Sequence, residues 1–345
     1  MNTTTVSIIV PCYNAPQFLR RLLAELPRQT YPHDLIEVII VDDASAQPVS
    51  HVVAEMSSLF FNFRRLHLVQ HERNMGRAAA RNSGILYSTG ELLLFNDVDD
   101  FPDPDFIELV VARHLAKPRI AVRGNIRVLP EICVRSAFLR YRNSRFLGSR
   151  KYPQGKFKLN CRDLSPCFFA TSGSSVMRSD LLAVGYFDER FTGYGGEDEE
   201  MGYRLFTSGV RIVFEENAHI WDGDDTTTLE RTCERYRNYG RLGARLLFAT
   251  HPDYLPYTSF RWHEPVDRQS DSLRIGLTKL LIRCVLRPAV AGMLQRFLKA
   301  IDHRRLPLDP PSVFYQYVLR TCYQQGVQER PAKVDSFPPR NSKSL

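Results

Sequence analysis

Residues 92–100 of this 345-residue chain read Leu-Leu-Leu-Phe-Asn-Asp-Val-Asp-Asp. The apolar run at their start predicts a short strand that is buried on both faces of a parallel sheet. The run ends abruptly in Asp97, Asp99 and Asp100. Ligands of open α/β sheets bind beyond the carboxyl ends of the strands, so this strand is expected to present its carboxylates at a binding edge.

Asp97 and Asp99 alternate along an extended chain, so both carboxylates can point the same way. They then repel each other unless a cation lies between them, and Mg²⁺ or Mn²⁺ binds through one or two carboxylates plus substrate phosphates. A polar turn that caps the next helix explains the same acids, because residues 102–105 read Pro-Asp-Pro-Asp. These residues alone leave both interpretations open.

Strand and helix patterns alternate on either side of this stretch. Strands are expected over 6–10, 36–41, 66–70, 120–129, 168–178 and 211–214, and helices over 16–28, 78–87, 107–115 and 201–208. This alternation predicts an α/β fold with a mostly parallel sheet flanked by helices. Residues 131–165 have no clear pattern, and a loop over the site is one interpretation of them.

A second strand also ends in acids, at Asp42 and Asp43. An acid after an early strand commonly hydrogen-bonds the base or ribose of a nucleotide. The chain has no Gly-rich dinucleotide fingerprint and no Walker loop, so phosphates must be held differently. A metal at the aspartates of 97–99, together with Arg77 or Arg81, would hold them; a solvated helix face is the other interpretation of Arg81.

Residues 193–200 read Gly-Tyr-Gly-Gly-Glu-Asp-Glu-Glu. Acids in the first turn of a helix favour the helix dipole, which accounts for Glu199 and Glu200. A carboxylate beside a mobile glycine loop also suits a general base that must meet an acceptor hydroxyl. His219 follows a strand of the same unit, so it is either a structural histidine or a third metal position.

Together these stretches resemble the family 2 inverting glycosyltransferases, which have a GT-A nucleotide-sugar fold. The resemblance covers about residues 5–225 and rests on four motifs in order: 7–14 (Ser-Ile-Ile-Val-Pro-Cys-Tyr-Asn), 41–45 (Val-Asp-Asp-Ala-Ser), 74–84 (Asn-Met-Gly-Arg-Ala-Ala-Ala-Arg-Asn-Ser-Gly) and 97–100 (Asp-Val-Asp-Asp). Residues 193–198 also resemble the acceptor-side motif of β-1,4-galactosyltransferases and their N-acetylgalactosaminyl relatives. Tyr194 stands where that motif usually has Trp, so sugar specificity does not carry over.

The resemblance implies a role for each matching residue. The nucleobase and ribose would be contacted by Pro11, Tyr13, Asp42 and Asp43, and Arg81 would lie near the base or diphosphate. The ion, Mn²⁺ or Mg²⁺, would be bound by Asp97, Asp99 and His219, and Asp97 would also lie beside the donor. Asp198 would be the catalytic base, and Tyr194, Gly196 and Glu197 would contact the acceptor or donor sugar. The implied reaction is a metal-dependent, inverting transfer from a nucleotide-diphosphate sugar, with a UDP-sugar favoured, to a glycan or lipid-linked acceptor. A catalytically inactive nucleotide-sugar or carbohydrate-binding module on the same fold is the alternative.

The basic residues are concentrated after Glu230, where about 20 Lys and Arg face about 9 Asp and Glu, within a net charge of +8. We expect a catalytic domain over 1–230, a helical basic extension over 231–330 and a disordered tail over 331–345. Basic amphipathic helices in the extension either lie on an anionic membrane surface or pack on the catalytic domain with a solvated face. No motif predicts nucleic-acid binding.

The seven cysteines contain no Cys-x-x-Cys pair, which favours a reducing compartment over a disulfide framework or a zinc site. The first residues run directly into a strand pattern, so no signal peptide is expected. The expected location is the cytoplasm, with the basic extension offering a peripheral contact at the inner face of the cell membrane.

Overall fold

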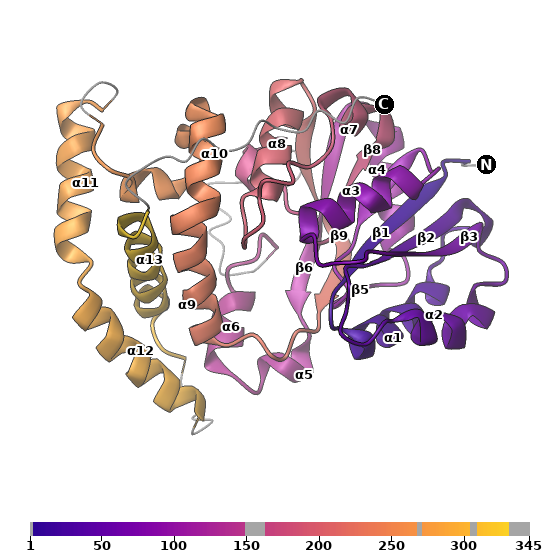
Figure 1. Cartoon of the computed structure of the whole chain (residues 1–345), viewed down its shortest axis with the longest axis horizontal. Coiled ribbons are helices and arrows are strands. Elements are labelled where there is room, and N and C mark those ends of the chain that lie inside the picture. The colour runs from indigo at the N-terminus through magenta and orange to yellow at the C-terminus, as the bar shows by residue number, and fades with distance from the viewer. Residues whose placement is uncertain (1–2, 149–162, 268–270, 304–308, 331–345) are drawn as a thin grey trace.

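A computed structural model of the chain describes residues 3–148, 163–267, 271–303 and 309–330. The expected tail over 331–345 and most of the second half of 131–165 lie outside these residues. The described part is a mixed α/β unit beside a bundle of C-terminal helices (Figure 1).

The sheet has the strand order β3-β2-β1-β4-β8-β6-β9-β5, with β7 (Asp163–Leu164) paired to β9. Its first half is parallel and consists of β1 (Val6–Cys12), β2 (Ile36–Asp42), β3 (Arg65–Gln70) and β4 (Leu92–Phe95). Every residue of β2 and β4 is buried, as expected for central strands covered on both faces. The carboxyl ends of β1, β2 and β4 therefore meet at one edge.

The second half of the sheet is mixed, which the sequence did not predict. Strand β8 (Ser174–Met177) runs antiparallel to both β4 and β6 (Ile120–Val128), and β6 runs parallel to β9 (Arg211–Asp222). Strand β5 (Asp100–Pro102) pairs antiparallel with the end of β9. This last pairing brings the acids after β4 beside the acids that end β9.

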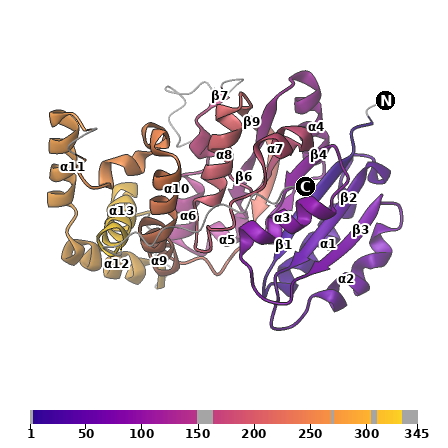
Figure 2. The ribbon, with the colours of Figure 1, turned by 45° about the horizontal axis from the view of Figure 1, so that its top comes forward.

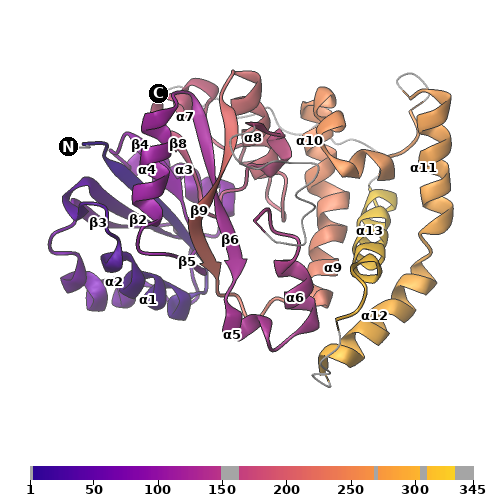
Figure 3. The same cartoon turned by 180° about the vertical axis from the view of Figure 1, so that it is seen from behind.

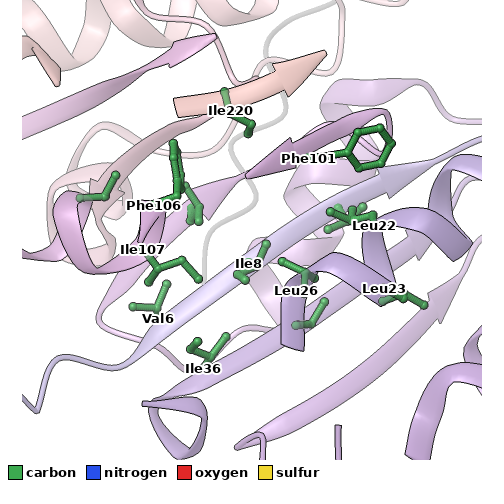
Figure 4. Packing of buried hydrophobic residues seen from close by; sticks show 14 of the residues in the cluster. Val6, Ile8, Leu22, Leu23, Leu26, Ile36, Phe101, Phe106, Ile107 and Ile220 are labelled. Carbon is green, nitrogen blue, oxygen red and sulfur yellow. The ribbon is translucent and has the colours of Figure 1, made fainter. Parts of the chain in front are cut away.

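Helices cover both faces of the sheet (Figure 2). On one face α1 (Pro16–Glu25), α2 (Ser50–Met56) and α4 (Phe106–Ala116) bury a cluster that includes Ile8, Leu22 and Ile220 (Figure 4). On the other face α3 (Arg77–Tyr87), α7 (Arg178–Val184) and α8 (Glu197–Thr207) cover a second cluster. Helix α3 lies close to β1 because Gly84 has no side chain: a Cβ there would stand 2.4 Å from Ile9.

Part of the unassigned 131–165 stretch is helical, in α5 (Pro130–Cys133) and α6 (Ala137–Asn143). The C-terminal extension is helical as expected, with α9 (Leu229–Asn238), a π-helical turn over Tyr239–Gly243, α10 (Ala244–Thr250), α11 (Leu273–Val285), α12 (Pro288–His303) and α13 (Ser312–Gln328). Pro288 separates α11 from α12, because it starts the second helix. Figure 3 shows these helices side by side, with α13 next to α9 and α12.

Candidate active site

Arg81 is the centre of the site. Its guanidinium lies 3.1 Å from Asp97 Oδ1, 3.1 Å from Glu197 Oε1 and 3.4 Å from Asp198 Oδ1. One side chain thus joins the acids that follow β4 to the acids that begin α8. Arg81 is only 2% exposed, so the solvated-face interpretation of this residue is wrong.

The charge of Arg81 is fixed by its neighbours. Burial works against a charged guanidinium, but Asp198, Asp97 and Glu197 together raise the pKa of Arg81. Two buried atoms of the cluster, Arg81 Nε and Glu197 Oε2, have no hydrogen-bond partner among the described residues. Unpaired buried polar atoms are costly, and a polar ligand at this point would satisfy them.

Asp198 has the environment of a general base. Its Oδ1 accepts a hydrogen bond from Thr171 Oγ1 at 3.1 Å, and its Oδ2 accepts one from the Thr171 amide at 3.3 Å. Burial, first, and then the charge of Glu197 raise the pKa of Asp198 to about 6, against the lowering effect of Arg81. A carboxylate with this pKa is largely ionised near pH 7 and still accepts a proton readily.

Asp99 lies among other carboxylates. Burial and then the negative charges of Asp97, Asp222 and Asp224 raise the pKa of Asp99 to about 7. The pairing of β5 with β9 sets Asp100 opposite Asp222, and the Gly223 amide donates to Asp99 O at 2.8 Å. Repulsion of this kind is relieved by a cation, and an all-oxygen donor set suits Mg²⁺ or Mn²⁺. In the described ranges no three His, Cys, Asp or Glu side chains already form a metal-binding group.

The carboxylates of Asp222 and Asp224 have different kinds of partner. Asp222 forms an ion pair with Arg142 of α6 at 2.5 Å. Asp224 accepts hydrogen bonds from the hydroxyls of Thr226 and Thr227, which, with the Thr226 amide, hold its pKa below the usual range in spite of burial. The sequence analysis missed all of these residues, although acids at the end of a strand were the signal that identified Asp97.

His219 is not brought to the aspartates. It lies within β9, paired with Asn125 of β6, and its Nδ1 is 3.9 Å from Asp103 Oδ2. Side chains alternate along a strand, so His219 points to the opposite face of β9 from Asp222. The role of His219 as a metal ligand stays a prediction, and the negative charges that raise the pKa of Asp99 come from Asp97, Asp222 and Asp224.

The loops after β1 and β2 are tied to each other. The Asn14 amide donates to Ser45 Oγ at 2.8 Å, and the Ala46 amide donates to Asn14 Oδ1 at 2.8 Å. Asn14 and Ala44 both have positive φ, at 52° and 58°, a conformation that non-glycine residues adopt only when their surroundings hold them in it. This strained pair of loops forms the edge at which Pro11 and the half-exposed Tyr13 lie.

Asp42 and Asp43 are buried within this edge rather than free in it. Asp42 accepts the amides of Ser45 and Val49, each at 3.0 Å. Asp43 accepts the amides of Met75 and Gly76 at 2.8 and 2.9 Å. The two carboxylates hold the backbone of the loops in place. They can therefore contact a nucleotide only through the lone pairs that these hydrogen bonds do not use.

Tyr194 lies between two arginines. The guanidinium of Arg77 is 5.0 Å from the centre of its ring and that of Arg235 is 4.9 Å away. Arg77 begins α3 and Arg235 belongs to α9, so the glycine loop is held between the mixed α/β unit and the extension. Cation–π contacts of this geometry are worth roughly 0.5–2 kcal/mol.

Glu199 and Glu200 connect α8 to the extension. Glu199 Oε2 accepts hydrogen bonds from Tyr239 at 2.8 Å and Tyr254 at 2.9 Å. Glu200 pairs with Arg204 at 2.7 Å and contacts His251 at 3.0 Å. The helix dipole is therefore a small part of what these acids do, because both are anchors for residues 239–254.

We expect Gly196→Ala to destabilise the fold by about 2 kcal/mol or more. Gly196 has φ of +105°, and an added Cβ would stand 2.6 Å from the Phe191 ring; overpacking and a positive φ each cost stability. Urea unfolding measures the effect. The control is Gly292→Ala in α12, where nothing lies within 4 Å of an added Cβ, and equal stability of the two variants would contradict this account.

Comparison with known proteins identifies two matching families. The model of "Glycosyl transferase family 2" matches residues 7–184, and that of "N-terminal domain of galactosyltransferase" matches residues 158–246. The first match contains β1 to α7, and the second contains Tyr194, Asp198 and the anchors of the extension.

The chain is similar to curated bacterial enzymes. It is 28% identical over 268 residues to validoxylamine A glucosyltransferase of Streptomyces hygroscopicus subsp. limoneus, which covers 73% of this chain and 58% of that protein. It is 29% identical over 252 residues to pre-mycofactocin glycosyltransferase of Mycobacterium tuberculosis, which covers 72% of this chain and 48% of that protein. The chain thus spans about half to three fifths of the length of these relatives.

Solved structures share the fold. The mannosyltransferase PcManGT from Pyrobaculum calidifontis, in complex with GDP-Man and Mn²⁺, has a TM-score of 0.58 at 17% identity, with 96% of this chain and 89% of that chain covered. S. aureus TarS 1-349 in complex with UDP has a TM-score of 0.52 at 17% identity, with 94% and 90% covered. The second alignment, like the first, extends over nearly the whole chain, including the helical extension.

Proposed function

Since this chain belongs to glycosyl transferase family 2, we propose that it is a glycosyltransferase that transfers a sugar with inversion from a nucleotide-diphosphate donor to a hydroxyl of a glycan or lipid-linked acceptor. The observation that supports this most directly is the contact of Arg81 with Asp97 on one side and with Glu197 and Asp198 on the other. The buried guanidinium of Arg81 thereby joins the proposed donor end of the site to the proposed acceptor end.

The donor end is proposed to lie along the carboxyl edge of β1, β2 and β4. Tyr13 and Pro11 would contact the nucleobase, while Asp42 and Asp43 hold the loops that shape its pocket and border the ribose. UDP is the nucleotide that we favour. The neighbouring structures are complexes with GDP-Man in one protein and UDP in another, so the fold accommodates either base.

A divalent ion, Mn²⁺ or Mg²⁺, is proposed to bind at Asp97 and Asp99. The raised pKa of Asp99, which burial and the charges of Asp97, Asp222 and Asp224 produce, supports this assignment, because the cluster has more negative charge than its own cations neutralise. When bound, such an ion would neutralise the diphosphate leaving group. We propose Asp222 or Asp224 as the further ligand in preference to His219, because their charges act on Asp99.

The acceptor end is proposed to lie at the start of α8. Asp198 would remove the proton of the attacking hydroxyl, and Thr171 would hold its carboxylate in position. A single in-line displacement opposite the leaving group inverts the anomeric carbon. Tyr194, Gly196 and Glu197 would contact the acceptor or donor sugar, with the Tyr194 ring oriented by Arg77 and Arg235.

We propose a cytoplasmic location at the membrane surface, where a lipid-linked acceptor would be presented. None of the helices in the described ranges is both long enough and apolar enough to cross a bilayer. The six cysteines of the same ranges are free thiols, which supports a reducing compartment.

Thermal unfolding with UDP, GDP and their sugars, each with Mn²⁺ or a chelator, tests the donor site. One nucleotide is expected to stabilise the protein by about 2.7 kcal/mol at a hundred times its Kd, and only with the metal. Asp99→Ala should remove the metal-dependent part, because it deletes a carboxylate that we assign to the ion. Glu131→Gln, a surface carboxylate change on α5, is the control.

A nucleotide that stabilises the protein equally with and without Mn²⁺ would contradict the metal assignment. No stabilisation by any nucleotide, even with acceptor present, would contradict the donor site itself.

A further inference from the structure

Helix α11 exposes a continuous apolar stripe. Leu273, Leu277, Leu280, Leu281 and Val285 are each at least half exposed, and their spacing places them on one side of the helix. The opposite side is covered: Gly276 and Lys279 are buried, with Lys279 bonded to Asp271 at 2.6 Å and to Pro265 O at 3.2 Å. The stripe therefore faces away from the rest of the protein.

Helix α12 has two apolar sides. Ala291, Leu298 and Ile301 are buried, with Leu298 in the cluster that α13 and α6 share, whereas Val290, Met293 and Phe297 are between 42% and 68% exposed. A helix that only packed on a neighbour would need just the first side. Helix α12 follows α11 along the outer edge of the molecule (Figures 1 and 3).

The apolar surface is concentrated here. Eight of the twenty exposed large hydrophobic side chains in the described ranges belong to α11 and α12. A concentration of exposed apolar side chains of this kind marks an interaction site.

The charge around the stripe is positive. Residues 273–303 contain six Lys and Arg and one acid, Asp302; Lys279 and Lys299 pair with Asp271 and Glu230, and the other four are arginines. Asp302 is turned toward α6, where it accepts from the Ala137 amide at 2.7 Å. Arg274, Arg287 and Arg296 are exposed beside the stripe, and long arginine side chains can lie along apolar surface while their charges remain in the headgroup layer.

We propose that α11 and α12 form a docking face for an anionic lipid bilayer, with the apolar stripe in the acyl boundary and the arginines at the lipid headgroups. A second copy of the chain is the less favoured occupant, because two such faces would bring like charges together. The proposal deepens the proposed function by naming the membrane partner. Its test needs neither donor nor acceptor, so loss of transfer and loss of docking are measured separately.

The test is co-sedimentation of the full chain with vesicles of phosphatidylcholine plus phosphatidylglycerol, and with vesicles of phosphatidylcholine alone. Tighter binding to the anionic vesicles, weakened by salt, is expected. Leu277→Gln/Leu281→Gln/Met293→Gln should weaken binding at least about tenfold, since each leucine buried in lipid contributes substantially. Arg274→Gln/Arg287→Gln should lower affinity for anionic vesicles by about fivefold per arginine.

The matched control is Leu86→Gln/Leu115→Gln, two equally exposed leucines on the catalytic unit, which should bind as the wild type does. All variants change exposed side chains and should unfold at the wild-type temperature. Failure of the wild type to bind anionic vesicles, or unchanged binding by the stripe variant, would overturn the proposal. So would sedimentation velocity showing a dimer that the stripe substitutions dissociate.

Discussion

Asp198→Asn is expected to lower kcat for sugar transfer by about 10²–10⁴-fold, the usual contribution of a positioned general base. Asparagine has nearly the shape of aspartate and can still accept the hydrogen bond from Thr171 Oγ1, losing only the longer one from the Thr171 amide, so the fold and donor binding should remain. Steady-state kinetics measures the loss of transfer, and thermal unfolding with the donor nucleotide measures binding. A variant that turned over at close to the wild-type rate would exclude Asp198 as the base.

The pH dependence of the wild type follows from the same residue. Burial and Glu197 raise the pKa of Asp198 to about 6. A base acts in its deprotonated form, so kcat/KM should be level above this pH and fall about tenfold per unit below it. Donor affinity measured over the same pH range separates the fall in kcat/KM caused by protonation of Asp198 from an effect of titration at Asp99. Activity that stays constant down to about pH 5 would contradict the assignment.

Arg81→Met is expected to destabilise the folded state by about 3–5 kcal/mol, because it leaves three carboxylates around a buried, uncompensated position. Methionine has a similar length and keeps the apolar contacts of the stem, so the charge is the main change. Urea unfolding at neutral pH measures the loss. The control is Arg20→Met, which removes a surface ion pair with Glu55 and should cost less than about 1 kcal/mol.

The destabilisation by Arg81→Met should depend on pH in a defined direction. Without the cation, nothing offsets the burial and the charge of Glu197 that already raise the pKa of Asp198 in the folded state above its value in the unfolded chain. The folded variant then binds more protons than the unfolded one, and its stability falls as the pH rises. The loss should be smaller near pH 5 than near pH 8. A loss that does not change with pH would mean that packing, not charge, is responsible.

The parallel half of the fold could be predicted because it is local in sequence. Each of its strands is a short apolar run that ends in a turn, as in residues 92–100. The small residues of α3 likewise indicate that this helix packs closely on β1. The antiparallel half could not be predicted, since the position of β8 between β4 and β6 joins segments far apart in the chain. Sequence pattern carries no register for such pairings.

The candidate site likewise contains residues that local sequence patterns predicted and residues that they did not. Asp97, Arg81, Glu197 and Asp198 were identified from the sequence, and the structure brings them together. Asp222 was missed because Glu215 and Glu216 interrupt the apolar pattern of β9, which continues to Asp222 itself. An acid at that strand end would have met the criterion that selected Asp97.

The bonds from Tyr239 and Tyr254 to Glu199 determine how this chain can be divided. A fragment that stopped at residue 230 would lose both phenol donors together with the part of the extension that covers Glu199, whose burial raises its pKa to about 7. The extension can therefore not be exchanged as an independent module. A chimera with a relative's C-terminal helices would need hydroxyl donors at the same two points. The mixed α/β unit and the extension would therefore have to be exchanged together.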